Sequence, residues 1–118
     1  KIVYSVVSRA LNKEMLKGTI DILILSVLKE RDSYGYEISK IIKAKSGNSF
    51  EILEATMYLS LKRLENQGYI EGYFGNETGG GRRRYFTITE LGIEQLAQLS
   101  SDWKQMVQLV SKFIKTNE

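Results

Sequence analysis

The 118-residue chain contains no cysteine and no histidine. Without cysteine it can form no disulfide bond, no thiolate nucleophile and few kinds of zinc site. Without histidine it lacks the commonest general base and the commonest metal ligand. No Ser-x-x-Lys motif, metal-type carboxylate cluster or phosphate-cradling loop makes up for these absences. The sequence therefore predicts a protein that is not an enzyme and that carries no cofactor or metal.

The chain also lacks any run of 18 or more apolar residues, so no membrane-spanning helix is expected. Residues 1–11 are rich in apolar side chains, but they lack a small-residue cleavage site and do not read as a signal peptide. The length suits one domain, and the apolar and charged fractions are ordinary for a globular protein. These features favour a single-domain cytoplasmic protein.

Positive charge is concentrated at one place in the chain. The net charge of +3 is too small to indicate a nucleic-acid-binding protein. Arg82, Arg83 and Arg84, however, follow three consecutive glycines at 79–81. Guanidinium groups suit phosphate geometry, so this cluster favours phosphate contact. A second basic pair, residues 62–63, is equally consistent with solvated surface.

The arginine cluster lies between two segments with strand character. Residues 69–74 and 84–88 are short runs of aromatic and β-branched side chains, and the glycines between them allow a tight turn. Two such runs joined by a glycine-containing connection predict a β-hairpin. A narrow hairpin with arginines near its tip can enter a groove of a nucleic acid. We therefore predict a two-stranded wing.

Residues 15–28 predict a helix that is apolar on two faces. Leu23 and Val27 share one face of the helical wheel, whereas Ile22 and Leu25 lie toward another. A helix of this kind is buried on two sides. In so short a protein, we expect another subunit to provide the second covering.

Two further helices are expected before the hairpin. Asp32 and Ser33 would supply the turn and the N-cap of one helix, which ends near residues 46–48. The other covers residues 53–67 and is followed by Gly68, a good C-terminal stop. Its expected core stripe is formed by Leu53, Met57, Leu61 and Leu64.

A last helix is expected to open at Thr89 and Glu90 and to run toward Ile114. Its apolar positions alternate in steps of three and four, as in the a/d seam of a coiled coil, which predicts a dimer interface. The interface residues are Leu96, Leu99, Trp103, Met106, Val110 and Phe113. A tryptophan at such a position is most often a packing anchor, and ligand binding is the alternative for Trp103.

The order helix, helix, helix, wing predicts a mainly α protein with a two-stranded β wing, the winged helix-turn-helix fold, followed by a C-terminal dimerisation helix. The third helix would lie in the major groove of DNA. Its outward-facing candidates for DNA contact are Ala55, Thr56, Leu59, Lys62 and Arg63. Small and apolar groups can meet a thymine methyl, and basic groups can reach phosphate or guanine. Plain solvent surface remains the alternative for each of these residues.

Six motifs occur in order at unbroken spacing over some two-thirds of the chain. They are LKG at 16–18, YGYEI at 34–38, EATMY at 54–58, KRLENQGYI at 62–70, GGGRRRYF at 79–86 and TITELG at 87–92. In these motifs the chain resembles the PadR family of bacterial transcriptional regulators. The resemblance implies a homodimeric repressor that binds double-stranded operator DNA, with Tyr58, at the tyrosine of the family motif, contacting the DNA backbone.

The short single C-terminal helix resembles the smaller subclass of the family, and within it the lactococcal multidrug-responsive type. The resemblance implies that planar hydrophobic, often cationic compounds are held between subunits against Trp103 and its dimer mate, and that binding releases the operator. The other positions matched to this multidrug-binding pore are Met15, Ile22, Ser26, Ser100 and Val107.

Three positions depart from the pattern of these relatives. Leu59 stands where many family members have proline, which implies different DNA contacts at the start of the third helix. Val107 and Ser100 stand where the drug-binding type has bulkier or more acidic groups, so a preference for cations does not carry over directly. Asp21 or Asp102 could supply the missing carboxylate.

The sequence is thus divided into an N-terminal extension at 1–14, a winged helix-turn-helix domain at 15–89 and a dimerisation helix at 90–118. Two alternatives to the repressor stay open. A protein-interaction module would not need the arginine cluster at 82–84. A non-specific nucleic-acid binder would show salt-dependent binding without sequence preference.

Overall fold

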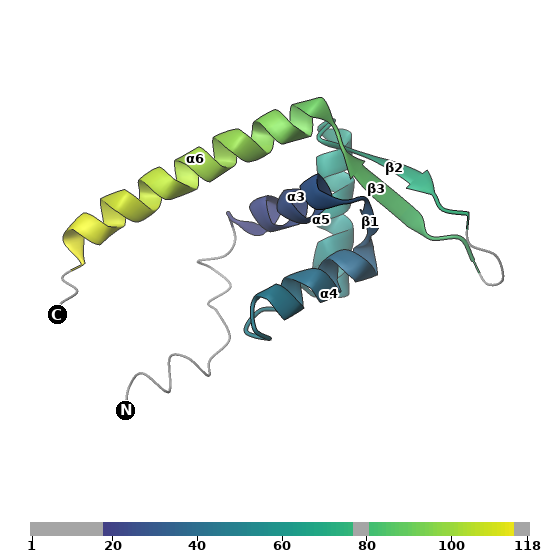
Figure 1. The fold of residues 1–118 in the computed structure, drawn as a ribbon, viewed down its shortest axis with the longest axis horizontal. Coiled ribbons are helices and arrows are strands. Elements are labelled where there is room, and N and C mark those ends of the chain that lie inside the picture. Colours follow the sequence, from purple (N-terminus) through teal and green to yellow (C-terminus); the bar gives the residue numbers. More distant parts are fainter. Residues whose placement is uncertain (1–17, 77–80, 115–118) are drawn as a thin grey trace.

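A computed structural model of the chain describes residues 18–76 and 81–114. In chain order and with the labels of Figure 1, the elements are α3 (Ile20–Glu30), β1 (Ser33–Tyr34), α4 (Gly35–Lys45), α5 (Glu54–Asn66), β2 (Ile70–Phe74), β3 (Arg84–Ile88) and α6 (Glu90–Phe113). This order confirms the predicted mainly α fold with a β wing. The expected N-terminal extension at 1–14 lies outside the described residues.

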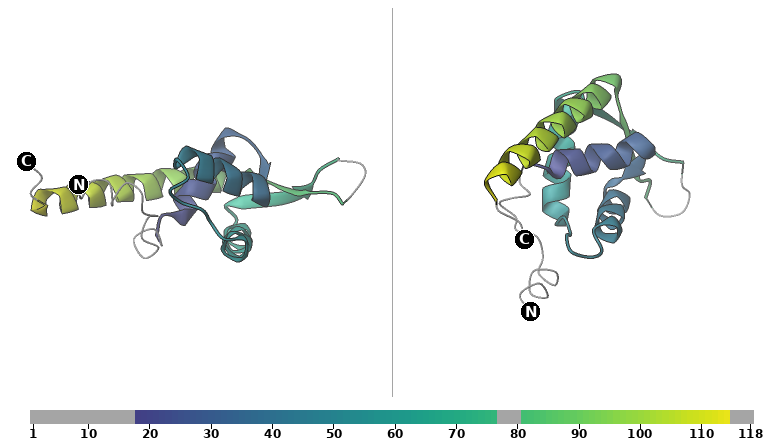
Figure 2. Two further views of the ribbon diagram at one scale, coloured as in Figure 1. Left: turned by 90° about the horizontal axis from the view of Figure 1, so that it is seen from below. Right: turned by 60° about the vertical axis from the view of Figure 1, so that its left-hand side comes forward.

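The molecule is elongated because two elements project from a cluster of three helices. Helices α3, α4 and α5 gather beside a small sheet, while α6 and the β2–β3 hairpin extend in opposite directions (Figure 1; Figure 2). The principal extents of 56 × 31 × 21 Å reflect this arrangement. The outer ends of β2 and β3 and the end of α6 therefore lie at opposite ends of the described part of the protein.

Helix α3 lies at the centre of the hydrophobic core. Ile24 and Leu25 are fully buried and Leu28 nearly so, because α4, α5, β3 and α6 all contact this helix. Burial of Leu25 is thus achieved within one chain and does not require the second subunit that we expected. The helix begins at Ile20, and residues 18–19 form the turn before it, so our prediction that these two residues are helical is wrong. Residues 15–17 of the predicted helix lie outside the described residues.

The sheet contains one strand more than the sequence predicted. Its antiparallel order is β1-β3-β2, with Ser33 opposite Phe86 and Tyr34 opposite Tyr85. Ser33 is therefore not the N-cap of the second helix, as we had expected. It pairs with β3 and is fully buried, and α4 begins two residues later, at Gly35. The predicted hairpin itself is confirmed, with Gly72 opposite Phe86.

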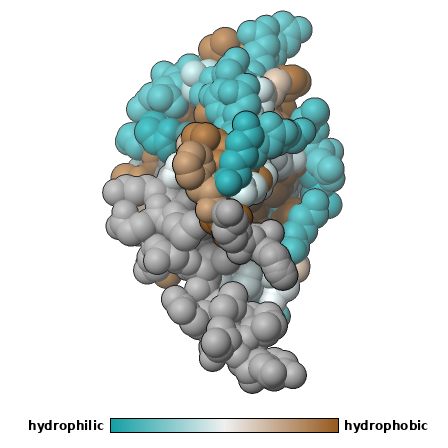
Figure 3. Space-filling view, turned by 90° about the vertical axis from the view of Figure 1, so that its left-hand side faces the viewer, coloured by the Kyte–Doolittle hydropathy of each residue, from teal (hydrophilic) through white to brown (hydrophobic). Residues whose placement is uncertain are grey.

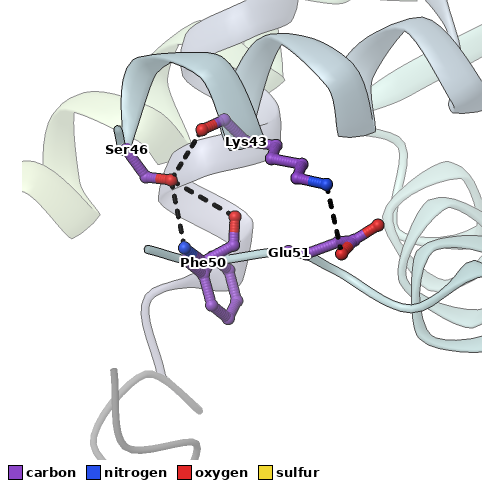
Figure 4. A network of polar contacts seen from close by, with 4 residues as sticks. All are labelled: Lys43, Ser46, Phe50 and Glu51. Carbon is purple, nitrogen blue, oxygen red and sulfur yellow. Dashed lines mark hydrogen bonds and ion pairs between the residues drawn. The ribbon is translucent and has the colours of Figure 1, made fainter. Parts of the chain in front are cut away.

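The turn between α4 and α5 is closed by side-chain contacts (Figure 4). The Ser46 hydroxyl lies 2.8 Å from the Lys43 carbonyl oxygen and accepts a hydrogen bond of 3.1 Å from the Phe50 N–H. Lys43 also forms a 3.6 Å ion pair with Glu51. Gly47, at φ 66°, adopts the left-handed conformation that ends the helix. These contacts fix the direction in which the chain enters α5.

Helix α5 keeps most of the predicted core stripe. Met57, Leu61 and Leu64 are buried, but Leu53 is 61% exposed, contrary to our expectation. Leu53 is the extended residue before the helix, so its side chain does not follow the helical row, and the preceding Ile52 is buried instead. Gly68, at φ 85°, follows the end of α5, as predicted.

Helix α6 opens with the expected cap and is covered over only part of its length. The Thr89 hydroxyl accepts a 3.0 Å hydrogen bond from the Gly92 N–H. Leu96 is buried and Leu99 packs against the core, whereas Trp103 and the residues that follow it to Ile114 are exposed. Apolar surface, bordered by hydrophilic residues, is visible on the side from which α6 projects (Figure 3). The uncovered residues continue the apolar row that packs on the core.

Candidate nucleic-acid interface

The outer face of α5 carries the side chains that we predicted to contact DNA. Met57, Leu61 and Leu64 turn the helix toward the core, which leaves the opposite face in solvent. The exposed residues on α5 are Glu54, Ala55, Thr56, Tyr58, Leu59, Lys62, Arg63 and Asn66. The structure thus brings all six predicted α5 residues to the solvent-exposed part of one helix.

The two basic residues of this helix behave differently. The ammonium of Lys62 lies 5.9 Å from the ring centroid of Tyr58. Arg63 instead donates hydrogen bonds of 2.9 and 2.7 Å to the two carboxylate oxygens of Asp21 on α3. These hydrogen bonds raise the pKa of Arg63 above its ordinary value. Arg63 therefore fastens α5 to α3, and its charge is compensated within the protein.

Arg84 of the wing is also engaged by a carboxylate. It donates hydrogen bonds of 3.0 and 2.7 Å to the two oxygens of Glu65 on α5. The hydrogen bonds from Arg84 lower the pKa of Glu65 below its usual range. Gly72 leaves room for this arrangement, since a Cβ there would lie 2.4 Å from Cζ of Arg84. Arg84 thus joins the wing to α5.

Arg82 and Arg83 precede β3, and only Arg84 of the cluster lies within the strand. The guanidinium of Arg82 lies 5.3 Å from the ring centroid of Phe74, and that of Arg83 lies 4.7 Å from the ring centroid of Tyr34. Both arginines are exposed. The predicted glycine turn falls partly on residues 77–80, which lie outside the described residues.

A row of three tyrosines crosses the sheet and stiffens the base of the wing. Tyr34, Tyr85 and Tyr73 stand in register, with ring centroids 5.3 and 5.8 Å apart. The Tyr73 hydroxyl donates a 2.5 Å hydrogen bond to Asp32, which raises the pKa of Tyr73 to about 12. Sequence reasoning missed this row because β1 was not anticipated as a strand.

A groove of about 1190 Å³ separates α4, α5 and the sheet. Its rim includes Tyr36 and Lys40, which sequence analysis did not propose as functional residues. The ammonium of Lys40 lies 5.4 Å from the ring centroid of Tyr36, which repeats the arrangement of Lys62 over Tyr58. The signal in the sequence is a tyrosine followed four residues later by a lysine, present once on each of the two helices.

The predicted ligand-binding residues are only partly brought together within one chain. Ser26 and Ser100 line a second, open groove of about 1040 Å³ between α3 and α6. Ile22 packs against the core, while Trp103, 49% exposed, and Val107 lie farther along α6 and do not line this groove. Met15 lies outside the described residues.

The described residues hold no group of three or more acidic residues placed to bind a metal ion. Among the helices of residues 18–76 and 81–114, none is both long and apolar enough to cross a membrane.

Comparisons with known proteins agree with this architecture. Residues 24–98 match the family described as "Transcriptional regulator PadR-like family". The chain is 43% identical to a transcriptional regulator from Clostridium thermocellum, with a TM-score of 0.82, covering 86% of this chain and 99% of that one. A PadR family transcription regulator from Clostridium difficile is 38% identical, with a TM-score of 0.70, covering 81% and 98%. A PadR-like regulator from Bacillus cereus is 31% identical, with a TM-score of 0.74, covering 88% and 99%.

Proposed function

Because the chain belongs to the PadR-like family of transcriptional regulators, we propose that it is a homodimeric repressor that binds operator DNA and is released from it by a planar hydrophobic ligand. The family establishes a role in transcriptional regulation. Repression, dimerisation and ligand release are the added elements of the proposal, and the exposed apolar residues of α6 support the last two.

The main support for DNA binding is that the exposed face of α5 is continuous with the wing. Tyr58, Leu59 and Lys62 are exposed on the helix that would enter the major groove. The Glu65–Arg84 ion pair holds the wing beside this helix, so Arg82 and Arg83 extend the same surface. Phosphate contacts from the wing would set the position, and side chains of α5 would read the bases.

Dimerisation is supported by the uncovered half of α6. The exposed apolar residues there are Trp103, Met106, Val107, Leu109, Val110, Phe113 and Ile114. A contiguous row of this kind is typical of a protein–protein contact. A second copy would bury the row around a two-fold axis and place two α5 helices in successive major grooves, roughly 34 Å apart. The operator would then be close to palindromic.

Ligand release is supported by the position of Trp103 on the same row. At the dimer axis, two tryptophans could face a flat aromatic compound from both sides. A compound that binds more tightly when the two wings are mis-spaced for DNA must weaken DNA binding by the same coupling factor. A compound that fits both spacings equally would leave the repressor on its operator.

Fluorescence anisotropy of a labelled duplex tests the DNA-binding proposal. The duplex is taken from the region upstream of the protein's own gene and compared with a scrambled duplex at two salt concentrations. We expect a specificity ratio of about a thousand or more. Equal, salt-sensitive binding to both duplexes would indicate a non-specific nucleic-acid binder, and no binding to either would favour a protein-interaction module.

Binding of planar dyes, followed by the fluorescence of the dye itself, tests the ligand. Trp103→Ala should weaken binding by tenfold or more, because each subunit loses the face on which the dye stacks. Lys112→Ala, a truncation of an exposed residue of α6 outside the apolar row, provides the control. Equal dye affinity in Trp103→Ala and the unaltered protein would exclude Trp103 as the ligand-binding residue.

A further inference from the structure

Two matched pairs of side chains occupy neighbouring helices of the candidate interface. Tyr36 and Lys40 lie four residues apart on α4, and Tyr58 and Lys62 lie four residues apart on α5. In each pair the lysine ammonium lies over the tyrosine ring, at 5.4 and 5.9 Å from the centroid. The tyrosines are 67% and 62% exposed, so neither ring serves as core packing.

Both pairs border the same groove, which has an apolar floor. Met57, Leu61 and Phe86 are buried and form part of its lining. Gly35, at the start of α4, lies close to α5, since a Cβ there would stand 3.5 Å from Leu61 and 3.7 Å from Met57. The two helices, and with them the two pairs, are therefore held at a fixed separation.

The charges around the groove single out the two lysines. Lys43 is paired with Glu51, and Arg84 is paired with Glu65. Within the described part of the chain, neither Lys40 nor Lys62 has a carboxylate within ion-pair distance. The groove is thus bordered by two ammonium groups that form no ion pair within the described residues, one on α4 and one on α5, each over a tyrosine ring, although Lys62 still feels the charge of Glu65.

We propose that these two Tyr–Lys units grip the sugar–phosphate backbone of operator DNA from two sides, with Tyr36 and Lys40 forming a contact on α4 in addition to the one on α5. This inference rests on the DNA-binding function proposed above. The aromatic ring holds the lysine stem beside it. The ammonium can then pair with a phosphate while the tyrosine hydroxyl donates to a phosphate oxygen.

Two features favour an extended polyanion over a small anionic ligand. The two lysines border an open groove whose lining also includes the carboxylates of Glu51, Glu54 and Glu65, which disfavour a small anion inside it. Tyr36 also lies in the first turn of α4, where the helix dipole favours negative charge. A DNA strand crossing the rim would meet both units without entering the groove.

The salt dependence of binding tests the grip. In the full-length protein, Lys40→Gln and Lys62→Gln should each reduce the slope of log K against log salt by about 0.9, and the double variant by about 1.8. Both duplexes should be affected equally, because phosphate contacts carry no sequence information. Tyr36→Phe, which removes only the hydroxyl, should weaken binding roughly tenfold. Lys45→Gln, an exposed lysine of α4 that does not line the groove, should leave the slope unchanged.

The outcomes separate this inference from the proposed function. If Lys40→Gln keeps the slope and affinity of the unaltered protein while specific binding persists, the grip on α4 is disproved and the repressor stands. An equal loss in Lys45→Gln would also overturn it, since it would reveal a diffuse charge effect. Failure of the unaltered protein to bind either duplex would remove both proposals. Circular dichroism melting of each variant checks that it is folded.

Neutral methylphosphonates, introduced one at a time into the duplex, locate the contact. At the phosphate that Lys40 touches, the substitution and Lys40→Gln should not be additive, because either change alone removes the same interaction. Additive losses at every phosphate scanned would exclude a direct contact.

Discussion

Arg84 of β3 and Glu65 of α5 form a two-point ion pair, with N–O distances of 3.0 and 2.7 Å across 19 residues of sequence. It connects the wing to the helix proposed to read the major groove. One arginine of the cluster at 82–84 therefore has a structural partner, and the electrostatic roles of the three are unequal.

Glu65→Gln should destabilise the protein at neutral pH and have little effect in acid. Arg84 lowers the pKa of Glu65, so the pair stabilises the fold above the ordinary glutamate pKa of 4.5. That stabilisation is lost as the pH falls through the lowered folded-state pKa. Because the pair is exposed, we expect a loss of about 0.5 kcal/mol at pH 7. Urea unfolding at pH 7 and pH 3 measures the difference, and an equal loss at both values would contradict the assignment.

Arg82→Ala and Arg84→Ala should differ in their effect on the salt dependence of DNA binding. Arg82 has no carboxylate within ion-pair distance in the described part of the chain, so its loss should reduce the slope by about 0.9. The charge of Arg84 is already compensated by Glu65, so its loss should reduce the slope by less than half as much. Titrations at four salt concentrations compare the two variants. Equal reductions would show that DNA displaces Glu65 from Arg84.

Asp21→Asn and Arg63→Gln should each lower stability, and the double variant should be no less stable than either single one. The two side chains share a bidentate pair 2.7 to 2.9 Å long between α3 and α5. Each single change should cost about 0.5 to 1 kcal/mol, as for other exposed pairs. A double-mutant cycle by urea denaturation measures the coupling. Additive losses would mean that the pair contributes nothing as a pair.

Tyr73 should titrate near pH 12, two units above an ordinary tyrosine. The hydrogen bond to Asp32 favours the protonated phenol, so it is fully present below pH 10 and is lost as the pH rises through the raised pKa. Asp32→Ala should return the pKa toward 10. Carbon-13 NMR of tyrosines labelled at Cζ follows the titration, and Tyr73→Phe assigns the resonance. An unchanged value in Asp32→Ala would rule out Asp32 as the cause.

Val110→Glu should convert the proposed dimer into a monomer. Val110 lies in the exposed apolar row of α6, and burying a carboxylate in the interface would be strongly unfavourable. Light scattering after size exclusion should give twice the 13.5 kDa chain mass for the unaltered protein and a single chain mass for the variant. Gln108→Glu introduces the same charge on the polar side of α6 and should remain dimeric. A dimeric Val110→Glu protein would place the interface elsewhere.

The sequence was a good guide to features set by local pattern. Hydrophobic periodicity and caps predicted α3 from residue 20 to residue 28, α5 to within one residue at each end, and the Thr89 cap of α6. The glycine-flanked aromatic runs predicted β2 and β3. These features depend on residues close together in the chain, and such signals are visible in one sequence.

Features set by tertiary pairing were not predicted. Ser33 resembles a helix cap in sequence, but pairing with Phe86, far along the chain, makes it a strand residue. The basic residues Arg63 and Arg84 looked equivalent to Lys62 and Arg82, yet carboxylates 42 and 19 residues away engage them. No periodicity reports such distant partners, so the functional weight of each charge emerged only from the folded arrangement.

The ion pairs that connect α5 to its neighbours affect the entropic cost of the proposed DNA binding. This helix is anchored to α3 through Arg63 and to the wing through Glu65, and its inner face is locked in the core. Little conformational freedom then remains for DNA to remove from the helix proposed to read the bases, so the entropic cost of binding would fall mainly on exposed side chains. The preference for one DNA sequence would then depend mainly on how the rigid protein is positioned on the duplex. Conformational change of the protein on binding would contribute less.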